Sequence, residues 1–100
     1  MKHAAKPFRF GVQEHAALSG KAWRDRARLV ESLGYQLLYL PDHFGEQLAP
    51  IAALMTAADA TTTLRVGSLV FDNDYRHPVV LAKEAATLDV LSGCRFELGL

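Results

Sequence analysis

Apolar and polar residues follow one another along this chain in blocks that predict four short strands separated by three helices. Apolar runs at 8–13, 36–40, 64–71 and 95–100 have the length of strands. Between them, apolar residues recur every three or four positions, as they do on one face of an amphipathic helix. The order β-α-β-α-β-α-β predicts parallel strands joined by right-handed crossovers.

Residues with strong conformational preferences mark the ends of the expected helices. Ser19 or Gly20 can cap the first helix, and Gly34 stands where a helix C-terminus favours a left-handed residue. Pro50 and Pro78 suit the first positions of the second and third helices, because proline lacks an N–H that would be unpaired there.

Each helix is expected to bury one stripe of apolar side chains, with Trp23 as a core anchor. Cys94, in the connection before the last strand, is expected to be a small buried residue. The expected stripes are Trp23, Ala27, Val30 and Leu33 in the first helix, Ile51, Leu54, Met55 and Ala58 in the second, and Leu81, Ala85, Leu88 and Leu91 in the third.

Three of the expected strands run directly into polar clusters, whereas the helix-to-strand connections are short and chemically plain. The clusters are QEH at 13–15, PDH at 41–43 and DNDYRH at 72–77. In a parallel α/β fold the C-terminal ends of all strands lie on one face, and binding sites form there. The pattern therefore predicts an enzyme-like α/β barrel or sheet with its site at that face.

Composition narrows the class of protein. The 100 residues allow one domain, half of them are hydrophobic and the formal charges cancel, which is typical of a soluble globular protein. Balanced charge argues against nucleic-acid or anionic-membrane partners. A single cysteine excludes an internal disulfide and favours a reducing cytoplasm. No apolar run reaches the roughly 18–20 residues that span a bilayer.

The expected last strand has no helix after it, which would leave one apolar face uncovered and one edge unpaired. We therefore expect residues 1–100 to be a single partial domain, the N-terminal part of a larger barrel, with a flexible tail at 1–7. The alternative is a small flavodoxin-like sheet that is complete in itself.

Asp42 and His43 are the strongest candidates for catalytic residues. They follow a buried strand directly, and a histidine there titrates near neutral pH and can move protons. The structural alternative is an aspartate that caps the loop, with the histidine packed against it. In the third strand, Gly67 before Ser68 indicates a bulge or the close approach of a ligand; the alternative is a small residue under a helix.

Other polar residues near the strand ends have simpler interpretations. His77 is expected to begin a helix, and Asp72, Asn73 and Asp74 are expected to form turns. A metal-dependent barrel hydrolase is a further alternative, but no His-x-His pair follows the first strand and no cysteine pair exists. The residues expected on one rim that could serve such a metal are His15, Asp42, His43, Asp72, Asp74 and His77.

Taken in order, several segments resemble the luciferase-like monooxygenase superfamily, and within it the branch that uses the deazaflavin coenzyme F420. The resemblance covers nearly the whole chain. One departure is Cys94, which stands where the family usually has glycine before Arg-Phe. The matching segments are RFGV at 9–12, ESLGY at 31–35, LPDHF at 40–44, LRVGSLV at 64–70, and HP at 77–78 through AKEAATLD at 82–89 to SGCRFELGL at 92–100.

The resemblance implies an α/β fold that is the N-terminal third of a luciferase-like (β/α)8 TIM barrel, with the coenzyme across its C-terminal mouth. It implies that Asp42 helps to hold the coenzyme and that His43 accepts or donates a proton. A bulge is implied in the third strand, with a non-proline cis peptide at Ser68–Leu69 behind the central ring of the coenzyme. The residues implied to bind coenzyme are Asp42, Gly67, Ser68, Leu69, Phe71 and Asn73.

The implied activity is hydride transfer between coenzyme F420 and a small organic substrate, in a homo-oligomer. A close alternative is an FMN-dependent monooxygenase of the same family, which uses molecular oxygen. A non-enzymatic alternative is an inactive truncated fragment that associates with itself. The substrate cannot be identified from these residues, because the resemblance implies further specificity loops beyond residue 100.

Overall fold

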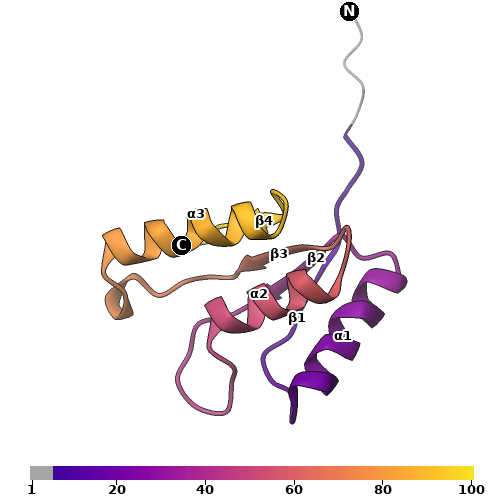
Figure 1. Ribbon diagram of the computed structural model, residues 1–100, viewed down its shortest axis with the longest axis horizontal. Helices are drawn as coiled ribbons and strands as arrows, with labels where there is room; N and C mark the ends of the chain where they lie inside the picture. The colour runs from indigo at the N-terminus through magenta and orange to yellow at the C-terminus, as the bar shows by residue number, and fades with distance from the viewer. Residues whose placement is uncertain (1–5) are drawn as a thin grey trace, which may run out of the picture.

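A computed structural model describes residues 6–100, so that most of the tail expected at 1–7 lies outside the described residues. Strands and helices alternate as the sequence pattern predicts (Figure 1). A short 3-10 helix follows the third strand. The elements are β1 (Gly11–Gln13), α1 (Gly20–Ser32), β2 (Leu37–Leu40), α2 (Pro50–Ala60), β3 (Arg65–Ser68), η1 (Asn73–Tyr75), α3 (Pro78–Leu91) and β4 (Phe96–Glu97).

The four strands form one parallel sheet in the order β1-β2-β3-β4. Each strand therefore pairs with its neighbour in the sequence, and each crossover contains one helix. In a flavodoxin-like sheet the strand order reverses, so that helices cover both faces. Here the order never reverses and all three helices contribute to one core, as in a segment of a β/α barrel. The flavodoxin-like alternative is thus wrong.

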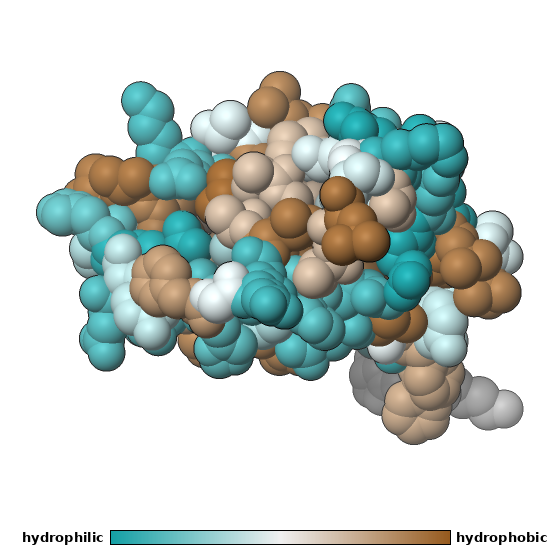
Figure 2. All heavy atoms as spheres, turned by 90° about the horizontal axis from the view of Figure 1, so that it is seen from below, coloured by the Kyte–Doolittle hydropathy of each residue, from teal (hydrophilic) through white to brown (hydrophobic). Residues whose placement is uncertain are grey.

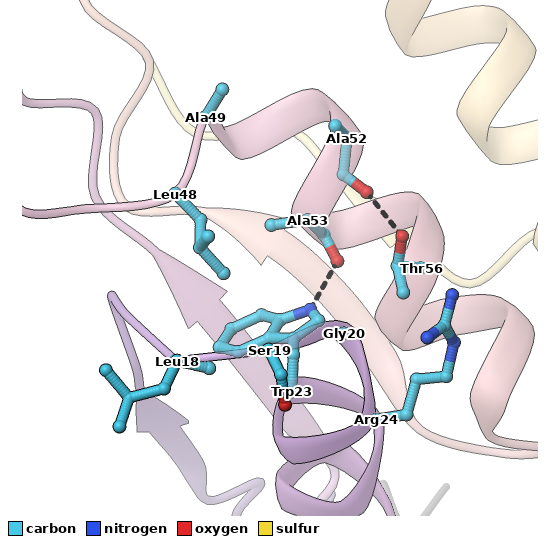
Figure 3. A pocket seen from close by; sticks show the side chains of 11 residues that line it. Leu18, Ser19, Gly20, Trp23, Arg24, Leu48, Ala49, Ala52, Ala53 and Thr56 are labelled. Atoms are coloured by element: carbon cyan, nitrogen blue, oxygen red, sulfur yellow. Dashed lines mark hydrogen bonds between the residues drawn. The ribbon is translucent and has the colours of Figure 1, made fainter.

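The core lies between the helices and one face of the sheet. Leu38, Val66 and Phe96 lie side by side across three paired strands and meet the buried residues of the helices. The Trp23 indole is 2% exposed, and its Nε1 donates a hydrogen bond to the Ala53 carbonyl oxygen at 2.8 Å (Figure 3). Trp23 therefore anchors α1 to α2, as expected.

Side chains of alternate strand residues lie on the opposite face of the sheet, away from this core. The Tyr39 ring packs there against Gly11, where an added Cβ would come within 2.9 Å of it. At Gly67 an added Cβ would lie 2.6 Å from the Glu97 carbonyl oxygen of β4. The close approach at Gly67 is therefore made by Glu97 of β4 and by the Tyr39 ring of β2, which by themselves account for the glycine.

A charged cluster spans this opposite face. The Glu97 carboxylate pairs with Arg9 at 2.7 Å and with Arg65 at 2.6 Å. Burial raises the pKa of Glu97, but hydrogen bonds from Arg9 and Arg65 outweigh it and hold the pKa below its ordinary value. Since Arg9 precedes β1 and Glu97 lies in β4, the ion pair links the two edges of the sheet.

The ends of the helices follow the local signals. Ser19 caps α1 by accepting a hydrogen bond from the Ala22 N–H at 3.0 Å, and Gly34 after the helix has φ 89°. Pro50 and Pro78 begin α2 and α3. None of the helices within residues 6–100 is long and apolar enough to cross a lipid bilayer.

Three expectations about burial are wrong. Leu33 is 65% exposed and Leu91 63% exposed, because each lies at the end of its helix, beyond the part that packs on the sheet. Cys94 is exposed as well. It follows Gly93 in a tight turn, both residues have positive φ (64° and 69°), and the turn directs the thiol outward. The predicted strands were also longer than those observed, since pairing is confined to two to four residues in each.

The outer surface of the helices is partly apolar. Figure 2 shows an apolar area surrounded by hydrophilic residues on the underside of the molecule. A groove of about 270 Å³ between α2 and α3 is lined by Ile51, Met55, Leu88 and Leu91 among others. A second hollow of about 350 Å³ lies between the start of α1 and α2, beside Trp23 (Figure 3).

Candidate functional site

The C-terminal ends of β2 and β3 meet at one rim, as the sequence predicts. Leu40 pairs with Ser68 in the parallel register, and the Leu69 N–H donates a hydrogen bond to the Leu40 carbonyl oxygen at 2.8 Å. The chain then continues into a β2–α2 loop at 41–49 and a β3–α3 segment at 69–77. Asp42 and the third-strand residues around Ser68 therefore share the same edge of the sheet.

Asp42 is almost buried, at 8% exposure, and its carboxylate binds the β3–α3 segment. Oδ2 accepts hydrogen bonds from the Asp72 N–H at 2.9 Å and from Arg76 Nε at 3.0 Å. Oδ1 accepts a third from Arg76 Nη2 at 3.1 Å. Arg76 therefore binds both carboxylate oxygens in a bidentate ion pair, the geometry that guanidinium groups favour.

The surroundings of Asp42 decide its charge. Burial raises the pKa of Asp42, since it disfavours the ionised form. Hydrogen bonds from Arg76 and from the Asp72 backbone, together with the positive charge of Arg76, outweigh burial and hold the pKa below its ordinary value. Asp42 is therefore an ionised carboxylate at neutral pH.

The loop that carries His43 is organised by Gln47. Its side-chain oxygen accepts a hydrogen bond from the His43 N–H at 3.3 Å. Its side-chain nitrogen donates to the carbonyl oxygens of Pro41 and, at 3.1 Å, of Leu48. The His43 backbone is thus held in a closed loop while its imidazole remains exposed. The sequence pattern gave no sign of this role for Gln47, because the contacts form only once the loop closes.

A hollow of about 310 Å³ lies beside Asp42 and His43. Two exposed aromatic rings, Phe44 and Tyr75, meet at its wall with their centroids 4.6 Å apart. Neither ring was singled out from the sequence, since each is an isolated aromatic residue in a loop. The lining residues are Asp42, His43, Phe44, Gly45, Gln47, Ala49, Pro50, Tyr75 and Arg76.

Ser68 is buried and its hydroxyl is fully engaged with the backbone. Its Oγ donates to the Gly99 carbonyl oxygen and accepts from the Gly99 N–H, both at 2.9 Å. An added Cβ at Gly99 would lie only 2.2 Å from the Ser68 carbonyl oxygen. These contacts give Ser68 a structural role in joining β3 to the segment after β4, and a contact of Ser68 with coenzyme stays a prediction.

The cis peptide bond is at Leu69–Val70 and not at Ser68–Leu69 as expected. The reason is the length of the strand ladder. Strand pairing continues as far as Ser68, which pairs with Leu40, and the Leu69 N–H still bonds across to β2. Leu69 and Val70 are 48% and 43% exposed, and they offer apolar surface at the rim.

Phe71 lies in the core, at 1% exposure, with its ring 6.4 Å from that of Phe96. The Arg76 guanidinium sits 4.8 Å above the Phe71 ring. Phe71 is therefore a core residue of the described chain, and its expected place near the edge of a coenzyme ring stays a prediction. Phe71 supports Arg76 from below, because the chain turns inward after the rim residues Leu69 and Val70.

The remaining polar residues of the segment shape its backbone. Asp72 accepts a hydrogen bond from the Asp74 N–H at 2.9 Å and so begins η1, while Asn73 is exposed within it. His77 caps α3, since its Nδ1 accepts from the Val79 N–H at 3.2 Å. The turn-forming and helix-entry interpretations are thus confirmed for Asp72 and His77.

No group of three or more His, Cys, Asp or Glu side chains within residues 6–100 is arranged to hold a metal ion. The acidic residue that precedes His43 in the chain, Asp42, is already bound to Arg76. The arrangement as a whole provides an exposed imidazole, an ionised carboxylate held in place, apolar surface and a hollow, which suit an organic ligand and proton transfer.

Comparisons with known proteins identify the family to which the chain is similar. The family model described as luciferase-like monooxygenase matches residues 3–100. The chain is 36% identical over 84 residues to 4-hydroxyprotoasukamycin monooxygenase of Streptomyces nodosus subsp. asukaensis, with 78% of this chain and 23% of that protein covered. It is 29% identical over 73 residues to 5,10-methylenetetrahydromethanopterin reductase of Methanopyrus kandleri, with 73% and 21% covered.

Solved structures show the same fold. The coenzyme F420 dependent tetrahydromethanopterin reductase from Methanopyrus kandleri superposes with a TM-score of 0.81 at 24% identity, covering 90% of this chain and 26% of that one. The monooxygenase RslO1 from Streptomyces bottropensis gives 0.75 at 23% identity, covering 91% and 32%. The chain therefore spans about a quarter to a third of the length of these proteins.

Proposed function

Since the chain belongs to the luciferase-like monooxygenase family, we propose that it forms the part of an F420-dependent oxidoreductase in which a proton is moved beside the coenzyme. The proposed reaction is hydride transfer between coenzyme F420 and a small organic substrate. The observation that carries the proposal is the shared rim, where the ends of two paired parallel strands bring His43 and the Leu69–Val70 surface to one edge.

The described residues fit a flat organic coenzyme. Leu69 and Val70 are each about half exposed at the rim, although they are apolar, and a ring system could cover them. The hollow beside His43 provides room for substrate. Leu69 and Val70 would support the ring, and Gly67 and Asn73 would lie near it. When bound, F420 supplies the chemistry of hydride transfer, which no amino-acid side chain provides.

His43 is the proposed proton acceptor or donor. Its imidazole is exposed at the rim, while Gln47 fixes its backbone, so that the group can meet a substrate in a constant position. Asp42 stays ionised next to it and provides a fixed negative charge. A further role for Asp42 in holding the coenzyme, and the assembly into a homo-oligomer, remain parts of the proposal.

A His43→Ala change in the enzyme that carries this sequence tests the proposed role. We expect kcat to fall by about 10²–10⁴-fold, the usual contribution of a general acid or base. The dissociation constant for F420 should change little, because His43 is proposed to act on the substrate. Steady-state kinetics and fluorescence titration of F420 measure the two quantities. Unchanged turnover would remove His43 from the mechanism.

An FMN-dependent monooxygenase is the second candidate. It is supported by the relative with 36% identity, whose name is that of a monooxygenase. Absorbance and fluorescence spectra of the purified enzyme distinguish a deazaflavin from FMN, and consumption of molecular oxygen during turnover occurs only with the second candidate. A bound FMN that is reduced and then reoxidised by oxygen in step with substrate would replace the F420 proposal.

A further inference from the structure

We infer that Arg76 is a positioning residue, which fixes His43 by joining the β2–α2 loop to the β3–α3 segment through Asp42. We use the name rim latch for three contacts taken together: the Asp42–Arg76 ion pair, the hydrogen bond from the Asp72 N–H to Asp42, and the contact between the Phe44 and Tyr75 rings. The inference rests on the proposed function only in that His43 is taken as the group that accepts or donates the proton. The latch itself is a property of the chain without any coenzyme, so it can fail or hold independently of that function.

The first contact of the rim latch is the ion pair. Arg76 uses two nitrogens, Nε at 3.0 Å and Nη2 at 3.1 Å, on the two carboxylate oxygens of Asp42. The Asp72 N–H adds a third hydrogen bond at 2.9 Å. Asp42 and Arg76 lie 34 positions apart in the chain, so these bonds fasten one rim loop to the next. His43 follows Asp42 directly in the chain, so that holding Asp42 in place restrains the backbone on which His43 is carried.

The second contact of the rim latch is between two aromatic rings, those of Phe44 and Tyr75. Phe44 follows Asp42 by two positions, and Tyr75 directly precedes Arg76. The centroids of the two rings are 4.6 Å apart. Their contact joins the same two segments at a second point. Two points of attachment restrict rotation as well as separation, and His43 lies between Asp42 and Phe44 in the chain. The backbone that carries the imidazole is therefore restrained on both sides.

Arginine is needed at position 76 for a geometric reason. Its flat guanidinium bonds Asp42 along one side and covers the Phe71 ring, 4.8 Å from the centroid, with its face. Phe71 is buried in the core against Phe96. Arg76 therefore connects the buried Phe71 ring to the Asp42 carboxylate of the rim loop. A lysine carries the charge but can neither bind side-on nor stack in this way.

NMR spectroscopy of the isotopically labelled chain, without coenzyme, tests the rim latch. The variants are Arg76→Gln, which removes both the charge and the two-nitrogen contact with Asp42, and Arg76→Lys, which keeps only the charge. The matched control is Arg24→Gln, at an exposed arginine of α1. Ring-to-ring NOEs between Phe44 and Tyr75 and hydrogen exchange at the His43 and Asp72 amides report on the latch, while amides of β2 and β3 report on global stability.

We expect Arg76→Gln to lose the Phe44–Tyr75 NOEs and to speed exchange at His43 and Asp72 more than in the strands. Arg76→Lys should show the same losses in part, and Arg24→Gln none of them. Exchange that rises equally in the strands and at His43 would overturn the inference, because Arg76 would then be merely stabilising. Full retention of the NOEs in Arg76→Gln or in Arg76→Lys would also overturn it.

Removal of the Arg76 charge could instead unfold the chain by leaving Asp42 buried without a partner. The double variant Asp42→Asn with Arg76→Gln avoids this, because two neutral amides can bond to each other. With the double variant we expect a folded chain in which exchange at His43 is again faster than in the strands. A folded double variant with His43 protected as in the wild type would contradict the rim latch.

Discussion

Asp42 shows how the same residue type takes its role from its partners. A loop aspartate next to a histidine could have been a free carboxylate, a cap or a catalytic group. In the fold its carboxylate is 8% exposed and accepts three hydrogen bonds from Arg76 and Asp72. Its contribution to the site is therefore a fixed charge and a fixed loop, with His43 left as the exposed group.

Acid should weaken the fold through Asp42. The pKa of Asp42 is lower in the folded chain than its ordinary value, since the contacts with Arg76 outweigh burial. A carboxyl group of this kind adds stability above its unfolded pKa and loses it as pH falls through the folded pKa. We expect the wild type to lose more stability than Asp42→Asn between neutral pH and pH values below the ordinary range of aspartate. Urea unfolding at several pH values measures this, and parallel pH curves for the two proteins would contradict it.

At the scale of the elements, single side chains close the turns that join helix to strand. The Glu31 carboxylate, at the end of α1, accepts hydrogen bonds from the backbone N–H groups of Thr62, Thr63 and Leu64 at 3.0, 2.8 and 2.9 Å. These residues lead from α2 into β3. Burial raises the pKa of Glu31, but the bonds from the turn more than offset it and lower the pKa overall.

Replacing Glu31 by Gln should therefore loosen the entry to β3. The neutral amide oxygen is a weaker acceptor, and hydrogen bonds to a charged group contribute about 1.5–3 kcal/mol each at most. We expect a loss of about 1–3 kcal/mol in the free energy of unfolding, measured by urea denaturation. Glu46→Gln, in an exposed loop position, is the matched control and should change stability little. Equal effects of the two substitutions would refute the role of Glu31.

The start of α3 depends on a histidine cap. His77 Nδ1 accepts the Val79 N–H, and Pro78 occupies the first position of the helix. We expect His77→Ala to cost about 1 kcal/mol, the usual value for a lost N-cap, and His77→Asn to restore most of it. Thermal unfolding of the three proteins at a pH where histidine is neutral measures this. Equal stability of the alanine and asparagine variants would show that the cap contributes nothing.

At the scale of the whole molecule, glycines let the strands of the sheet come together. Gly67 faces Glu97 of β4, and an added Cβ would lie 2.6 Å from its carbonyl oxygen. We expect Gly67→Ala to destabilise the fold by about 1–3 kcal/mol, the usual cost of forcing atoms into a packed region. Gly45→Ala is an informative comparison. That glycine has φ 124° with nothing within 4 Å of an added Cβ, so its cost arises only from the backbone.

Urea denaturation together with strand amide shifts separates the two cases. Gly67→Ala should shift resonances in both β3 and β4, because one strand must move away from the other. Gly45→Ala should leave the sheet resonances unchanged and affect only its own loop. Undisturbed β4 resonances in Gly67→Ala would contradict the close approach of the two strands.

Much of the layout was determined by the sequence alone. The order of strands and helices, the first residues of α2 and α3 and the rim position of Asp42 and His43 were all predicted correctly. Each depends on signals within a few residues, such as apolar periodicity, a proline that lacks an N–H, or a polar cluster after an apolar run. Local sequence carries this information because backbone preference is a local property.

Only the tertiary structure decided which side chains meet. Arg76 reaches Asp42 across 34 positions and Arg9 reaches Glu97 across 88, and no periodicity encodes such partners. The exposure of Leu33 and Leu91 and the burial of Phe71 likewise depend on where each helix and loop meets the sheet. The physical reason is that ion pairs and burial arise from the packing of elements distant in sequence. Strand register and helix docking select those contacts among many that the sequence alone leaves open.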